Sequence, residues 1–186
     1  TDGLGEDWGI HDIGFKPYPS GACTHAAMEA LRRIVVEHDL SPEDVSKVVA
    51  TLPEATSETL PHKRPKNALQ GKFSIEFCLA AILRERDVGL EEFTDAYVTA
   101  PETRAVIENV SREYETEEFA GYGGRVRVET TEGESFVAEE PLAPGTPSNP
   151  LPSERWQAKF EGCAGAVLSA EAVAAVREAI ERFEEP

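Results

Sequence analysis

The chain has 186 residues, and its 35 acidic residues outnumber its 18 lysines and arginines, which leaves a formal net charge of −17 at pH 7. A surface this acidic repels nucleic acids and anionic membranes, and no apolar run is long enough to cross a bilayer. The length suits one domain, or one domain with an appendage. We therefore expect a soluble, cytoplasmic protein that binds neither nucleic acid nor membrane.

The acidic excess runs through the whole chain, and arginine is preferred over lysine among the basic residues. This pattern is typical of proteins that work in concentrated salt, where screening removes the repulsion between like charges. The sequence therefore supports the hypothesis of a halophilic source.

The sequence has no pattern that is typical of a metal site. The three cysteines stand far apart, at positions 23, 78 and 163, and form no CxxC pair. The four histidines lack an HExxH or similar spacing; they are His11, His25, His38 and His62. We therefore expect no bound metal. Cys23 and Cys78 fall in apolar helical stretches, and we interpret them as small core residues.

The chain begins with an irregular segment, residues 1–12, which is rich in glycine and acidic residues. We expect a chain that begins in this way to be cut from something longer. Residues 13–16 predict a short strand. From Ser20 to about His38 the apolar residues recur at helical spacing, which predicts a helix.

A lysine and two prolines lead into this helix, in the order Lys16-Pro17-Tyr18-Pro19. Prolines hold such a segment extended, and the open N–H groups at the start of a helix attract anions. Lys16 can add a full positive charge there, so we predict a carboxylate-binding corner. The alternative is an ordinary proline-rich helix start with a surface lysine.

His25 lies near the N-terminal end of the same helix, at the flank of its apolar stripe. The positive end of a helix disfavours the imidazolium, so a neutral ring could transfer protons. A packed or capping histidine is the alternative interpretation.

A second lysine stands before a second helix. Residues 75–83 are apolar almost all round, Ser74 is a good N-cap, and Lys72 precedes it by two positions. Two such corners in one small chain favour an anion site. The preceding stretch, 53–67, predicts a loop and carries the basic cluster His62-Lys63-Arg64.

The remaining elements predict an α+β fold, with a small antiparallel sheet packed against helices and further helices at the C-terminus. The glycines at 121–124 predict a bend rather than a phosphate cradle. Turn residues at 131–133 join two alternating segments into a hairpin with one solvated face. The expected strands are 45–52, 110–115, 125–130 and 134–140, and the expected helices are 89–97, 101–109, 153–162 and 169–183. Five prolines between 141 and 152 predict a rigid crossover, so we place the α+β domain at 1–146 and the crossover with its helices at 147–186.

Three motifs, taken in order, resemble the C-terminal part of the MmgE/PrpD family, which includes 2-methylcitrate dehydratase and cis-aconitate decarboxylase. The first is Lys16-Pro17-Tyr18-Pro19 followed by Thr24-His25, and the second is Leu69-Gln70-Gly71-Lys72-Phe73-Ser74-Ile75-Glu76-Phe77. The third is Gly145-Thr146-Pro147-Ser148-Asn149-Pro150-Leu151 with Lys159-Phe160. The resemblance covers nearly the whole chain.

The resemblance implies an α+β lid domain that closes over a large helical domain, with the active site in the cleft between them. It implies lyase chemistry on small di- and tricarboxylates without a cofactor, of the 2-methylcitrate dehydratase type used in propionate metabolism. Lys16 and His25 then become catalytic candidates, and Lys16, Lys72 and Ser74 substrate-binding candidates. The implied partners are a polycarboxylate substrate, a helical domain of the same or another chain, and further copies in a homo-oligomer.

Two departures from the family pattern affect these expectations. The N-terminal helical domain is absent from the sequence, so we expect the isolated chain to be inactive. Some relatives carry a histidine between the lysine and Thr-His, but residues 20–23 of this chain contain none. Other relatives use a tyrosine from the loop that corresponds to 53–67, and this loop contains no tyrosine here. The missing histidine argues against decarboxylation. The alternatives are a non-catalytic subunit that completes the cleft of a separate helical partner, and a racemase or decarboxylase of the same family.

Overall fold

The computed structural model describes residues 3–6, 8–116, 119 and 122–183. It divides into two compact units, Thr1–Leu151 and Pro152–Pro186, whereas the sequence suggested a boundary at 146. Among the described residues, no helix has the length and apolar character needed to cross a membrane. Residue 121 of the expected glycine bend lies outside the described part of the chain.

The first unit is built on a four-stranded sheet with the order β2-β1-β3-β4. The strands are β1 Val45–Pro53, β2 Val110–Glu115, β3 Gly124–Thr130 and β4 Ser135–Glu140. β3 pairs antiparallel with both β1 and β4, but β1 and β2 are parallel. The α+β class is thus confirmed, while the expectation of a purely antiparallel sheet is wrong. The long connection between β1 and β2, which contains four helices, leaves room for the crossover that a parallel pair needs.

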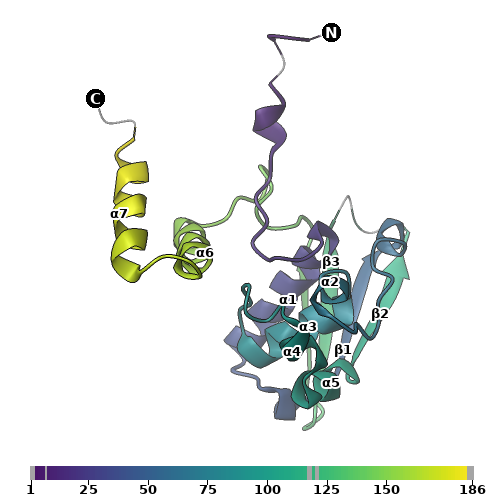
Figure 1. Ribbon diagram of the computed structural model, residues 1–186. Helices are drawn as coiled ribbons and strands as arrows, with labels where there is room; N and C mark the ends of the chain where they lie inside the picture. Colours follow the sequence, from purple (N-terminus) through teal and green to yellow (C-terminus); the bar gives the residue numbers. More distant parts are fainter. Residues whose placement is uncertain (1–2, 7, 117–118, 120–121, 184–186) are drawn as a thin grey trace. The chain divides into compact units, whose positions relative to one another are not determined.

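Two helices supply most of the core that covers the sheet: α1, His25–Glu37, and α3, Ile75–Glu85. α1 packs against β3 and β4, and α3 packs against α1, α5 and β2 (Figure 1). α1 shows the apolar spacing that the sequence predicted, and α3, which was predicted to be apolar almost all round, is buried from Ile75 to Leu83. The core includes Cys23 and Cys78, which confirms their interpretation as buried residues.

Three short helices complete the helical layer: α2 Ala68–Gly71, α4 Asp95–Thr99 and α5 Pro101–Ile107. The helix expected over 89–97 begins only at Asp95, because the Thr94 side chain accepts a hydrogen bond from the Tyr97 N–H and starts the helix there. No strand forms at 13–16. In that segment the Phe15 N–H donates to the Gly145 carbonyl at 2.7 Å.

The second unit consists of α6, Ser153–Gly165, and α7, Ala170–Glu181. Ser169 caps α7 by accepting the Ala172 N–H. An ion pair between Arg177 and Glu161, at 2.7 Å, joins the two helices. Val173 is the only buried residue of α6 and α7.

Candidate functional site

Lys16 lies on an exposed segment whose backbone is held by the third of the three motifs. The Phe15 N–H donates to the Gly145 carbonyl, and Gly145 has a φ of +87°. A Cβ atom on Gly145 would lie 1.8 Å from the Phe15 carbonyl oxygen, so only glycine fits this approach. The Lys16 Nζ donates to the Ser20 carbonyl at 3.3 Å. The position of Lys16 therefore depends on a turn far away in the sequence.

The two lysine-bearing segments are directly hydrogen-bonded to each other. Gly21 lies four positions before the start of α1, and its N–H donates to the Lys72 carbonyl at 2.9 Å. An added Cβ on Gly21 would meet that same carbonyl and the Phe73 ring at ordinary contact distance. The structure thus brings together the starts of α1 and α3.

Between these helix starts the side chains form a buried hydroxyl and sulfur cluster. The hydroxyls of Ser20 and Thr24 are 2.8 Å apart, and Thr24 also donates to the Gly21 carbonyl at 2.8 Å. Both hydroxyls contact the Met28 sulfur. Burial raises the pKa of the Cys78 thiol to about 12, so this thiol is a packed neutral group rather than a nucleophile.

His25 is the first residue of α1, and its side chain is only 1% exposed. Its ring meets the buried Tyr18 ring edge-on, with centroids 5.6 Å apart. The Tyr18 hydroxyl donates to Glu29 at 2.9 Å, and Arg32 donates to the other oxygen of that carboxylate at 2.8 Å. This burial favours the packing interpretation of His25, while proton transfer by its ring stays a prediction.

Ser74 is fully buried, and its hydroxyl accepts the Phe77 N–H at 3.2 Å. The predicted N-cap of α3 is therefore confirmed. Asn67 similarly caps α2 by accepting the Gln70 N–H. Lys72, at the C-terminal end of α2, is half-buried. A role for Ser74 or Lys72 in substrate binding stays a prediction.

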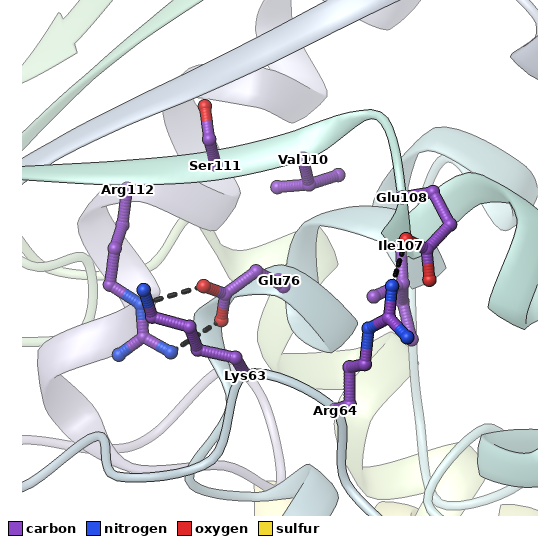
Figure 2. Close-up of a pocket in the computed structure, with 8 residues that line it drawn as sticks. All are labelled: Lys63, Arg64, Glu76, Ile107, Glu108, Val110, Ser111 and Arg112. Atoms are coloured by element: carbon purple, nitrogen blue, oxygen red, sulfur yellow. Dashed lines mark hydrogen bonds and ion pairs between the residues drawn. The ribbon is translucent and has the colours of Figure 1, made fainter.

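A pocket of about 200 Å³ lies beside the start of α3, next to β2 and the loop that carries Lys63 and Arg64. The residues that line it are Lys63, Arg64, Glu76, Ile107, Glu108, Val110, Ser111 and Arg112. Figure 2 shows Arg112 hydrogen-bonded to Glu76, and Arg64 paired with Glu108. None of Lys16, His25, Lys72 and Ser74 lines this pocket.

Arg112 and Glu76 form a bidentate ion pair that is almost completely buried. The two N–O distances are 2.7 and 2.6 Å, and the side chains are 4% and 5% exposed. Burial opposes the charge of Arg112, but its hydrogen bonds with Glu76 and Tyr114 outweigh that cost and raise the pKa of the guanidinium. Sequence reasoning missed this pair. Its only signal was a glutamate in the first turn of an otherwise apolar helix.

Comparison with known proteins assigns the chain to a family. A model of the MmgE/PrpD C-terminal domain matches residues 18–185. The chain belongs to the MmgE/PrpD family. Among curated proteins it is similar to cis-aconitate decarboxylase from Aspergillus terreus and to the protein of the same name from A. terreus strain NIH 2624 / FGSC A1156. Each is 26% identical over 181 residues, which cover 89% of this chain and 36% of the relative.

The chain therefore spans about a third of the length of these MmgE/PrpD relatives. The match begins at Tyr18, two positions after Lys16, and includes Thr24-His25 and the Lys72–Ser74 segment. Among the residues that the structure describes, no group of three or more histidine, cysteine or acidic side chains could hold a metal ion.

Proposed function

We propose that this MmgE/PrpD chain is the C-terminal part of a cofactor-independent hydro-lyase that acts on small di- or tricarboxylates, similar to 2-methylcitrate dehydratase. The observation that carries the proposal is the hydrogen bond from Gly21 to Lys72, which brings the starts of two lysine-flanked helices together in a member of this family. Helix N-termini and lysines together form a cationic corner, which a protein with a net charge of −17 needs in order to attract an anion.

The proposed reaction begins with removal of a proton from the carbon next to a carboxylate. The electron pair that remains forms a carbon–carbon double bond as the bond to the neighbouring hydroxyl oxygen breaks. The leaving hydroxide takes up a proton and departs as water. Negative charge develops on the carboxylate during the first step, and aimed N–H groups with nearby cations stabilise it.

We assign roles to four residues in this scheme. Lys16 binds a carboxylate and stabilises the charge that develops, and Lys72 with the Ser74-capped start of α3 binds a second carboxylate. His25 transfers a proton or donates a hydrogen bond to the substrate. A missing part of the site belongs to a helical domain of the same or a partner chain, as the length of the relatives supports.

The test uses this chain reconstituted with its helical partner domain, with 2-methylcitrate, citrate and cis-aconitate as substrates. We expect Lys16→Ala to lower kcat/KM by about 100-fold or more, because it removes a cation that acts on the transition state. Lys47→Ala is the matched control, since Lys47 is exposed on β1, and it should change kcat/KM by less than about twofold. Unchanged activity of Lys16→Ala would remove Lys16 from the site.

Decarboxylation is the second candidate reaction, because the curated relatives are named cis-aconitate decarboxylase. Product analysis separates the reactions. Decarboxylation releases carbon dioxide, dehydration releases water and hydration takes it up. Racemisation leaves the composition of the substrate unchanged and only inverts a stereocentre. Absence of all three with every substrate would contradict the proposed enzyme class.

A non-catalytic subunit is the candidate from a different class. The exposed apolar side chains of the second unit support it, since Ile180 and Phe183 are among the exposed large hydrophobic residues. Size-exclusion chromatography of this chain mixed with a separately produced helical domain tests the idea. A stable complex that leaves the turnover of the helical domain unchanged would favour the non-catalytic subunit over the lyase.

We also propose that the acidic surface is an adaptation to concentrated salt. Screening at high ionic strength weakens the self-repulsion of a chain with a net charge of −17. The melting temperature should therefore rise clearly as KCl increases from about 0.1 M to about 2 M. Equal melting temperatures at the two concentrations would contradict this adaptation.

A further inference from the structure

The buried pair of Arg112 and Glu76 connects three parts of the first unit. Glu76 belongs to the first turn of α3, two positions after the capping Ser74, and Arg112 belongs to β2. The third part is the loop that carries the basic cluster, because Arg112 also donates to the carbonyls of Leu60 and His62. Figure 2 shows the contact between the guanidinium and Glu76.

Every N–H donor of the Arg112 guanidinium has a partner within the protein. An arginine side chain has five such donors. Arg112 uses Nε and one Nη2 donor for Glu76, the other Nη2 donor for His62, and its two Nη1 donors for Leu60 and Tyr114. The guanidinium therefore has no donor left for an anion in the pocket, since all five bind groups of the protein itself.

A second arginine holds the same loop further along. The Nη2 of Arg104, on α5, donates to the Pro65 carbonyl at 2.5 Å. The loop is thus fixed through three backbone carbonyls, while the Lys63 side chain is exposed. These three hydrogen bonds hold the backbone of the loop that carries the basic side chains.

Stability alone does not account for such a pair. Replacing a buried ion pair by apolar residues of similar volume is often neutral or stabilising. A planar guanidinium does supply something that apolar side chains lack, because it fixes several oxygen atoms at set positions. Here those oxygens belong to the loop and to the turn that follows Lys72 and Ser74.

We infer that Arg112 is a positioning residue of the polycarboxylate site: it holds the loop 60–66 and the first turn of α3 in one fixed relation, and so fixes the position of Lys72, which directly precedes that turn. The inference rests on the proposed function, in which Lys72 binds a carboxylate. Because Lys72 lies just before this turn, a shift of the turn weakens substrate binding without altering the groups that carry out the reaction.

The decisive variant is Arg112→Lys, measured in the chain reconstituted with its helical partner domain. Lysine keeps a positive charge next to Glu76, but it cannot reach both loop carbonyls at once. We expect KM for cis-aconitate and citrate to rise about tenfold or more while kcat stays within about threefold of the wild type. Amide hydrogen exchange in residues 60–66 of the unliganded chain should become faster.

Two matched variants complete the experiment. Glu76→Gln replaces one carboxylate oxygen by an amino group that cannot accept from Arg112, so it weakens the link to α3 but leaves the Arg112 contacts with Leu60 and His62. KM should therefore rise, while amide exchange in the loop should stay close to wild type. Arg177→Lys makes the same substitution in the exposed pair with Glu161 and should change neither. If Glu76→Gln does not fold, the comparison of Arg112→Lys with Arg177→Lys decides alone.

The outcomes separate this inference from the proposed function. Faster exchange in the loop with an unchanged KM would overturn the inference, because the loop would be held for stability only. Slow exchange in the Arg112→Lys loop would overturn it as well. If the wild type does not turn over any of the polycarboxylates, the proposed function fails, and the positioning of a polycarboxylate site fails with it. The exchange data then still show whether Arg112 holds the loop.

Discussion

The two units of this chain use amphipathic helices in opposite ways. In the first unit, α1 buries Leu31, Ile34 and Val35 against α3 and the sheet. In the second unit, α7 has a similar apolar spacing, but Ile180 is 61% exposed and only Val173 is buried. The ion pairs differ in the same direction, since Arg112–Glu76 is buried and Arg177–Glu161 is exposed.

This contrast teaches that an apolar stripe predicts a helix but does not identify what covers the stripe. α1 and α7 satisfy the same rule of periodicity. The cover of α1 comes from strands that lie more than 80 residues further along the chain, whereas no residue among 152–183 of the second unit buries Ile180. The exposed apolar stripe of the second unit is consistent with the helical partner domain that we propose.

The largest difference between the units should appear when a large side chain on each apolar stripe is shortened. Leu31→Ala, at a fully buried position, should lower the free energy of unfolding by about 2–5 kcal/mol, because it removes burial and leaves a cavity. Ile180→Ala should change it by less than about 0.5 kcal/mol in the isolated chain. Urea denaturation followed by circular dichroism measures both values, and a loss of similar size for Ile180→Ala would mean that α7 is already covered.

A smaller difference is expected at the two serine N-caps. Ser74→Ala should cost about 1–2 kcal/mol, because it removes the cap of α3 at a buried position. Ser169→Ala removes the equivalent contact from α7 in an exposed position and should cost about 0.5 kcal/mol. Thermal unfolding by calorimetry gives the two losses. Equal losses would contradict the claim that burial distinguishes the helix starts.

The smallest effect concerns acid stability and the capping box before β1. Ser41 donates hydrogen bonds to Asp44 from its hydroxyl and its backbone N–H, and these lower the pKa of the Asp44 carboxyl. A pKa that is lower in the folded state contributes stability above the unfolded pKa, and this contribution is lost as the pH falls through the folded pKa. Stability should therefore fall below about pH 4.

The variant Asp44→Asn isolates this contribution. It should be less stable than wild type at neutral pH, and its stability should depend less on pH below about 4. Urea midpoints at several pH values measure the difference. If stability depends on pH in the same way in the two proteins, the pKa of Asp44 does not differ between the folded and unfolded states.

The candidate site could be predicted only in part from the sequence. Lys16 and Lys72 were proposed, and the Ser74 cap was correctly predicted, because a lysine, prolines or a serine just before an apolar run is a local signal. The sequence also placed His25 at the start of a helix, but its burial against Tyr18 depends on the fold around it. Arg112 and Glu76 were missed, because a charged residue in a strand or helix is normally solvated.

Local patterns in the sequence were enough to predict most of the helices and strands, the Ser74 cap of α3, the burial of Cys23 and Cys78 and the α+β class, because periodicity and capping act over a few neighbouring residues. The fold was needed to show that β2 runs parallel to β1, that Gly145 holds the segment of Lys16, and that Gly21 is bonded to Lys72. Each of these contacts joins segments that are far apart in the chain. Their formation depends on how the whole core packs, which no local pattern encodes.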